Sequence, residues 1–497
     1  MKKDAPCPSH GHSSSISPHH FVGPYHSSNP SPARSQAARM GSATPRERQP
    51  YVPTPEQIQL ANERKAKRIV AKMQQASAPT SPPDYSRWIL PRKWLPVSSP
   101  STPAKTRVTI MTWNMLAQCL VRGELFPGSD CLKIKDREQM LAAEILNYDA
   151  DIVCLQEVDR LDALLPRIHD TYDHIYASGP GKLHGCMLLY RRNRFEKLTS
   201  KVVCYDEEAL TQTDGAQKPG ATRRTNNIGL LAALRFKESS LGFERNKGCL
   251  IATTHLFWHP RFTYERTRQA FILLRTIQSF RSELHLQSWP VYIGGDFNSQ
   301  PTEPTYSLLV GQALLDTQRA ELETSRVVHV SIDPQVGVPG ADGSVQQSED
   351  NDENENEGRD GDDNNQDPII ANSRRPTTSD GLPSVRVLES VFRDELQGSL
   401  RSMYDAAHLT TDTFGQRHAL SSGRKGGSEA MWTSFTPLWR LTLDYIFALN
   451  GVEDNEAVEP RVLSVLAPHT TATLEPGLPR KGICASDHIA LAAEVEW

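Results

Sequence analysis

The sequence lacks the features of membrane and secreted proteins. No stretch reaches the roughly 18 consecutive apolar residues that a membrane span requires, so we expect no membrane contact. Residues 1–4 are polar and begin no apolar segment of the kind that directs secretion. The eight cysteines form no C-x-x-C pair, which indicates reduced thiols inside a cell rather than a disulfide scaffold or a zinc site.

The chain also lacks a strong net charge. Its formal net charge is -4, so the chain as a whole has no excess of basic residues for nucleic-acid binding. Acidic residues are concentrated at 348–367, a stretch of almost only Asp, Glu, Asn, Gly and Gln. Such a stretch cannot bury enough apolar surface to fold. We therefore expect residues 317–382 to be a disordered acidic insertion in a surface loop.

The remaining sequence predicts a polar N-terminal region followed by one large domain. Residues 1–53 are rich in Ser, Pro and His and are expected to be a disordered tail. Residues 54–105 should hold a basic helix and a linker whose apolar end lies against the main domain at 106–497. The tail is rich in Ser, like a mitochondrial transit peptide, but its Pro, Gly and His residues disfavour an amphipathic helix. A cytoplasmic or nuclear protein is therefore expected.

Short apolar runs alternate with helical patterns from residue 107 onward. The spacing of apolar residues predicts helices over 136–146, 263–284 and 384–402. Strands are predicted at 108–111, 152–155, 186–190, 228–234, 250–254, 291–293, 443–449, 462–466 and 489–495. Many strands with helices between them predict an α/β domain with two layers of sheet.

The domain is organised around the sequence Val-Tyr-Ile-Gly-Gly-Asp-Phe-Asn at 291–298. A short apolar strand is followed by two glycines, which allow a turn or the close approach of another group. Asp296 and Asn298 occupy alternate positions and therefore lie on one face of the strand. An acid beside an amide at a strand end suits a metal ion or a phosphate, although Gly-Asp-x-Asn also occurs in ordinary turns.

Other predicted strands also adjoin polar side chains that are costly to bury without a partner or a metal ion. These residues are Asn114, Glu157, His255, Asp444, Asp487 and His488. A single residue of this kind is more often a capped or solvated strand end. The whole set predicts one site at which the strand ends meet.

These stretches, taken in order, resemble the endonuclease/exonuclease/phosphatase superfamily. Its signatures match Gly-Asp-Phe-Asn at 295–298 and Ser-Asp-His at 486–488. Leu-Gln-Glu-Val at 155–158 and Leu-Asp-Tyr-Ile-Phe at 443–447 are closer to its deadenylase and nocturnin branch. Thr-His-Leu-Phe-Trp-His-Pro at 254–260 resembles the fungal Ngl-type RNA exonucleases. The resemblance implies a four-layer αββα sandwich with two central mixed β-sheets, as in deoxyribonuclease I, and one cleft at the strand ends.

The resemblance also implies a hydrolase of phosphodiester bonds that uses Mg²⁺ or Mn²⁺, as one or two ions. Glu157 is expected to be the main metal ligand, with assistance from Asn114. Asp296 is expected either to accept the proton of the attacking water or to hold a second ion. The full set of expected metal ligands is Glu157, Asp296, Asn298, His488 and Asp487.

The remaining polar residues are expected to handle the phosphate. Asn298 should orient it and His255 should contact it. His488 should bind the phosphate or a second ion, and Asp444 should fix the orientation and protonation of His488. Lys182 matches a phosphate-contacting lysine of the branch, although a solvated loop lysine explains its sequence equally well.

Substrate choice is expected to depend on Pro260 and Trp439, with Trp258 nearby. In the deadenylase-like branch, a proline and an aromatic residue at these positions sandwich the terminal base. Stacking tolerates many sequences, so single-stranded RNA with a 3′ end is the favoured substrate, with or without a preference for poly(A). A role in core filling is an equal alternative for Trp439.

Three functions remain open from the sequence. The favoured one is a Mg²⁺-dependent 3′-to-5′ exoribonuclease in RNA processing or turnover. The second is a metal-dependent phosphatase of a small molecule such as a dinucleotide. The third is an inactive RNA-binding scaffold, which the complete set of acids disfavours. No leucine-rich repeats of the kind that dock the large deadenylase precede the domain, and we expect a monomer.

Overall fold

The structure is a computed structural model. It describes residues 84–102, 105–210, 220–237, 247–336, 370, 372–394, 400–415, 420, 423–453 and 456–497. The expected N-terminal tail, the expected basic helix and the acidic stretch at 348–367 lie outside the described residues. Within the ranges given, no helix is long and apolar enough to cross a membrane.

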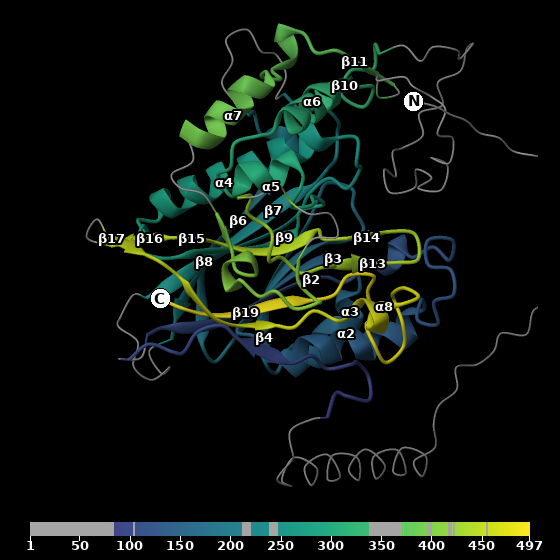
Figure 1. The fold of residues 1–497 in the computed structure, drawn as a ribbon, viewed down its shortest axis with the longest axis vertical. Helices are drawn as coiled ribbons and strands as arrows, with labels where there is room; N and C mark the ends of the chain where they lie inside the picture. The colour runs from purple at the N-terminus through teal and green to yellow at the C-terminus, as the bar shows by residue number, and fades with distance from the viewer. Residues whose placement is uncertain are drawn as a thin grey trace, which may run out of the picture. The chain divides into compact units, whose positions relative to one another are not determined.

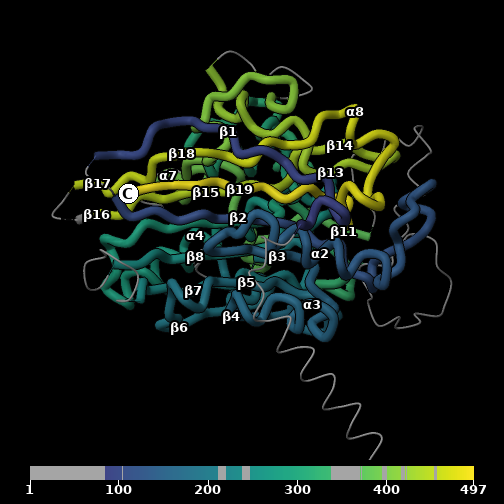
Figure 2. The backbone as a smooth tube through the Cα atoms, turned by 90° about the horizontal axis from the view of Figure 1, so that it is seen from below, coloured from purple at the N-terminus to yellow at the C-terminus, as the bar shows by residue number. Residues whose placement is uncertain are grey.

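Two β-sheets form the centre of the domain (Figure 1, Figure 2). The seven-stranded sheet has the order β1 (Trp94–Pro96), β18 (Arg461–Leu466), β19 (Leu491–Glu496), β2 (Arg107–Asn114), β3 (Ile152–Val158), β5 (Gly185–Arg191) and β4 (Tyr172–Ser178). The six-stranded sheet has the order β12 (Arg401–Ser402), β15 (Asp444–Leu449), β9 (Val291–Asp296), β8 (Gly248–His255), β7 (Ile228–Phe236) and β6 (Phe195–Cys204). Strands β2 and β3 are parallel, as are β8 and β9, while the other neighbours are antiparallel. Both sheets are therefore mixed.

Helices cover the outer face of each sheet (Figure 1). Each parallel pair of strands needs a crossover connection, which α2 (Ile134–Tyr148) and α4 (Thr263–Glu283) provide. Beside the six-stranded sheet lie α4 and α5 (Pro304–Leu309), and α6 (Asp316–Ser325) and α7 (Val385–Asp394) pack against these helices. Beside the seven-stranded sheet lie α2, α3 (Leu161–Ile168) and α8 (Thr471–Leu474). The predicted four-layer αββα sandwich is confirmed.

Alternation of buried side chains along the strands produces three apolar layers. In β9, Val291 and Ile293 pack on the helix side, whereas Tyr292 packs between the sheets. At Gly294, an added Cβ would lie only 2.9 Å from the Cβ of Cys154 on β3 of the other sheet. The glycine thus permits the close approach that its position in the sequence indicated.

The prediction that residues 317–382 are disordered is wrong at both ends of that range. The range includes most of α6 and two short paired strands, β10 (Val328–His329) and β11 (Ser373–Arg374). Leu322 on α6 is buried in the apolar layer that also contains α4, and Arg374 forms an ion pair with Asp380 at 2.8 Å. Tertiary contacts therefore order a polar sequence whose composition is that of a loop.

Two other predicted boundaries are also wrong. The helix expected over 384–402 ends as α7 at Asp394, and residues 401–402 form an edge strand because they pair with β15. The folded domain begins before residue 106, because β1 pairs with β18 and Ile89 is buried against the seven-stranded sheet. The apolar end of the expected linker does lie against the domain, as predicted.

Candidate active site

The strand ends that the sequence singled out meet at one edge of the two sheets. In the six-stranded sheet, Asp296 on β9 is directly opposite His255 on β8 and Asp444 on β15. Directly opposite residues share one face of a sheet, so these three side chains form a row. In the seven-stranded sheet, Asn114 ends β2 and Glu157 lies near the end of β3. Residues from both sheets therefore build the site.

Asn114 connects the two sheets. Its side-chain amide donates to Glu157 Oε1 at 2.8 Å and to Asp296 Oδ2 at 3.0 Å. The other oxygen of Glu157 accepts from the backbone N–H of Ala117 at 2.9 Å. Glu157 lies at a bulge between β3 and β5 and has a φ of 55°, and Asn298 has a φ of 47°. Left-handed backbone is uncommon outside glycine and is concentrated at functional sites.

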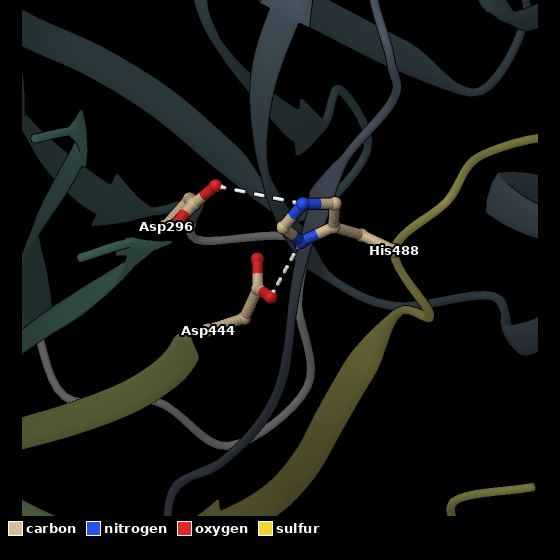
Figure 3. A group of neighbouring side chains, drawn as sticks. All are labelled: Asp296, Asp444 and His488. Carbon is tan, nitrogen blue, oxygen red and sulfur yellow. Dashed lines mark hydrogen bonds and ion pairs between the residues drawn. The ribbon is translucent and has the colours of Figure 1, made fainter. Parts of the chain in front are cut away.

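Asp296, Asp444 and His488 form a compact cluster (Figure 3). His488 Nδ1 lies 2.7 Å from Asp444 Oδ2, and its Nε2 lies 3.8 Å from Asp296 Oδ2. One ligand atom from each residue falls within 4.8 Å of the others. Among the described residues, no group hydrogen-bonds to the buried Oδ1 of Asp444. The cluster thus holds a charge-assisted hydrogen bond and one unsatisfied carboxylate oxygen.

Burial and like charges shift the acid–base equilibria of the site. Burial raises the pKa of Asp296, and the adjacent Asp444 adds to this effect while His488 and His255 oppose it. Burial also raises the pKa of Asp487 to about 6. Burial disfavours a charged His488, but the neighbouring carboxylates outweigh it and raise the His488 pKa well above its usual value. The folded state therefore favours the charged form of His488, which lies beside the carboxylates of Asp296 and Asp444.

This set of donors fits a hard divalent cation. Asn114 holds the carboxylates of Glu157 and Asp296 side by side, and like charges this close repel each other. The unsatisfied oxygen of Asp444 adds a further donor in the same buried region. Carboxylate oxygens are the ligands that Mg²⁺ and Mn²⁺ prefer, with waters completing the coordination. The described residues can therefore hold such an ion between the sheets.

A second polar group lies beside Glu157. His255 Nδ1 lies 3.9 Å from Glu157 Oε1, and the ring of His184 lies 6.4 Å from that of His255. Burial opposes the charge on Glu157, but His255 and His184 outweigh it, so the pKa of Glu157 is lowered. Lys182 donates to Asn227 Oδ1 at 3.1 Å, and Asn227 donates to the His255 carbonyl at 2.7 Å. Lys182 thus shares a small polar pocket with Glu157 and His255.

A cleft of about 500 Å³ opens from the acidic centre. Its polar lining includes Glu157, His255, Asp296, Asn298, Asp487 and His488. Its apolar lining includes Trp258, Pro260 and Trp439. Trp439 lies in the hairpin of β13 (Ser434–Phe435) and β14 (Arg440–Leu441), and its indole N–H donates to Ser434 Oγ at 2.9 Å. It is partly exposed and lines the cleft, so it does not fill the core.

The structure also identifies residues that the sequence analysis missed. His184 lies two positions beyond Lys182, so its place in that loop was the available signal. Arg137 on α2 is buried and donates to the carbonyls of Met115 and Ala485, at 2.5 and 2.7 Å. It therefore ties the loop after β2 to the loop that carries His488. No sequence pattern marked Arg137, because its role arises from contacts between distant segments.

Comparisons with known proteins agree with this architecture. Residues 111–488 match the model of the Endonuclease/Exonuclease/phosphatase family. A Schizosaccharomyces pombe protein named as a probable RNA exonuclease is 28% identical over 473 residues, covering 90% of this chain and 89% of that protein. The Saccharomyces cerevisiae RNA exonuclease NGL2 is 35% identical over 277 residues, covering 52% of each, so the chain spans about half of this relative. The crystal structure of ANGEL2, a 2′,3′-cyclic phosphatase, with adenosine-2′,3′-vanadate has 20% identity and a TM-score of 0.49, covering 82% of this chain and 99% of that one.

Proposed function

Since the chain belongs to the endonuclease/exonuclease/phosphatase family, a family of metal-dependent hydrolases, we propose that it is a Mg²⁺-dependent 3′-to-5′ exoribonuclease. One observation carries the proposal: the acidic centre lies in the same cleft as Trp258, Pro260 and Trp439. Acids that suit phosphodiester hydrolysis thus adjoin apolar surfaces that suit a nucleic-acid base. The names of the two fungal relatives support RNA as the substrate.

Hydrolysis requires an activated water and relief of charge on the phosphoryl oxygens. Glu157 would hold the metal ion, because Asn114 and Ala117 fix the orientation of its carboxylate. Bound Mg²⁺ supplies charge relief at the phosphoryl group. Asp296 lies beside Glu157, joined to it through the amide of Asn114, and accepts the proton of the attacking water. Asp444 orients His488 and favours its charged form, so His488 stabilises the negative charge that develops on the phosphate.

The other polar residues fix the position of the phosphate. Asn298 donates to the Leu256 carbonyl at 2.9 Å, which holds its side chain at the wall of the cleft. Lys182 and His255 contact the phosphate from the small polar pocket, and Asp487 supports the metal site next to His488. These groups position a single phosphodiester rather than a long duplex.

The 3′-terminal base occupies the apolar part of the cleft. Pro260 and Trp439 stack on its two faces, which supplies roughly 1–3 kcal/mol and tolerates different bases. When the 3′-terminal base occupies this position, the phosphodiester that joins the terminal nucleotide to the rest of the RNA lies at the acidic centre. The substrate therefore needs a free 3′ end. Poly(A) is one substrate of this kind.

Incubation of purified protein with 5′-labelled oligo(A), mixed-sequence RNA, single-stranded DNA and NADP tests the proposal. The proposal expects RNA to shorten stepwise from its 3′ end in Mg²⁺, no activity in excess EDTA, and no activity of Asp296→Asn. Release of phosphate from NADP with RNA left intact would overturn it in favour of a small-molecule phosphatase. Internal cleavage of RNA would overturn its exonucleolytic part.

A further inference from the structure

A buried arginine lies behind the apolar part of the cleft. Arg266 on α4 is 2% exposed. Its NH1 donates to the His259 carbonyl at 2.5 Å, and its NH2 donates to the Pro260 carbonyl at 3.2 Å. The same NH2 lies 3.4 Å from Glu303 Oε2. One nitrogen therefore bridges Pro260 and the carboxylate of Glu303, so the carboxylate lies next to the proline proposed to stack on the base.

Glu303 is held in place but not enclosed. It precedes α5, and its carbonyl accepts from the backbone N–H of Ser307 at 3.2 Å. Tyr306 anchors the same short helix through a hydrogen bond to the buried Glu429 at 2.8 Å. The Glu303 side chain is 22% exposed and lines the cleft. In the described part of the chain, Arg266 is the one side-chain partner of this carboxylate, which leaves it acceptor capacity toward the cleft.

A fixed carboxylate distinguishes bases by their exocyclic groups. Adenine and cytosine carry an amine at the position where guanine and uracil carry a keto oxygen. The amine can donate to a carboxylate, whereas the keto oxygen of uracil would face it as a second acceptor. Guanine has a further amine at its 2-position that can also donate, so the contrast is with uracil. A site that hydrogen-bonds a particular substrate group strongly rejects analogues that lack this group. An apolar pocket discriminates less strongly between substrates that differ only in size.

We propose that Glu303 is a specificity-determining residue that accepts a hydrogen bond from the exocyclic amine of the 3′-terminal base. The enzyme then removes terminal adenosine and cytidine in preference to uridine. The inference rests on the proposed exoribonuclease function, because it requires a terminal base in the cleft. Arg266 acts as the positioning residue that holds the carboxylate beside Pro260.

The test uses oligoribonucleotides that differ only at the 3′-terminal nucleotide, together with one that ends in a ribose without a base. For the parent enzyme we expect kcat/KM for terminal A and C to exceed that for U by roughly ten-fold or more, the effect of one hydrogen bond to a charged group. Glu303→Gln should bring the A-to-U ratio close to one and leave cleavage of the abasic end unchanged.

Glu321→Gln is the matched control. Glu321 also lies near Arg266 and accepts from Thr263 Oγ1 at 2.6 Å, but it does not line the cleft. This variant should keep the parent preference.

The outcomes distinguish the proposed role of Glu303 from the proposed exoribonuclease function. An unchanged A-to-U ratio in Glu303→Gln would overturn the role of Glu303 while RNA cleavage stands. An equal fall in kcat/KM on all substrates, including the one with the abasic end, would show that Glu303 supports the fold of the cleft. That result would also overturn its role in base selection. Absence of RNA cleavage by the parent enzyme would overturn the proposed function, and the inference with it.

Discussion

Glu429 should make the stability of the domain depend on pH. It is fully buried and accepts a hydrogen bond from Tyr306 at 2.8 Å. Burial raises its pKa from 4.5 to about 8; hydrogen bonds with Ser402 and Tyr306 oppose this rise, and the charge of Asp405 adds to it. Because the pKa is higher in the folded state, the carboxyl group stabilises the fold fully below pH 4.5. That stabilisation is lost as the pH rises through about 8.

The size of the effect follows from the pKa difference. A rise from 4.5 to about 8 corresponds to roughly 5 kcal/mol of unfolding free energy in total. About 3 kcal/mol of this is lost between about pH 6 and about pH 9. Glu429→Gln removes the titration but retains an oxygen that can accept from Tyr306. The pH dependence of the unfolding free energy should therefore be weaker in this variant by about 3 kcal/mol over that interval.

Urea unfolding at several pH values measures this difference directly. All other titrating groups are shared by the parent and the variant, so the difference between their unfolding free energies isolates Glu429. Glu124→Gln, at an exposed acid, should keep the pH dependence of the parent. A difference between the parent and Glu429→Gln that stays constant from pH 6 to pH 9 would refute the reasoning.

Three further predictions concern the site and the sheets. Glu157→Gln should lower turnover by several orders of magnitude with little change in melting temperature, because it removes charge relief in the transition state but no core packing; a kinetic assay across Mg²⁺ concentrations checks this. Trp439→Ala should weaken binding of RNA that has a 3′-terminal base by about ten- to a hundred-fold and leave binding of RNA with an abasic 3′ end unchanged. Equal losses of affinity for the two substrates would indicate a structural role for Trp439. Gly294→Val should destabilise the domain by about 1–3 kcal/mol in urea, because its side chain meets Cys154; Gly123→Ala, with open space around it, should not.

The centre of the fold was predictable because its strands are short, apolar and bounded by polar residues. Strands β2, β3, β8, β9 and β15 all begin or end within a few residues of the predicted limits. The carboxyl ends of β2, β3, β8 and β9 converge because the parallel crossovers place them at one edge of the sheets, and Asp444 joins them because β15 runs antiparallel to β9 and begins at that edge. The row formed by His255, Asp296 and Asp444 follows from strand register, which the sequence does not specify by itself.

Other parts of the fold depend on contacts that a local pattern cannot contain. Strands β4 and β6 were not predicted, because many of their side chains are partly exposed and give no clear apolar run. Helix α3 was missed because Pro166 interrupts its pattern. The contact between Arg266 and Glu303 joins residues that are far apart in the chain, so it could not be predicted from a local sequence pattern.

The bridge that Asn114 forms between Glu157 and Asp296 has a consequence for the lifetime of the protein. These carboxylates belong to different sheets, so a cation held at Glu157 would screen their mutual repulsion and thereby stabilise the contact between the two sheets. The free energy of ion binding then adds to that of folding, by about 1.4 kcal/mol for each ten-fold excess of ion over its dissociation constant. Depletion of the ion would therefore both stop hydrolysis and loosen the sandwich, which exposes the chain to proteolysis.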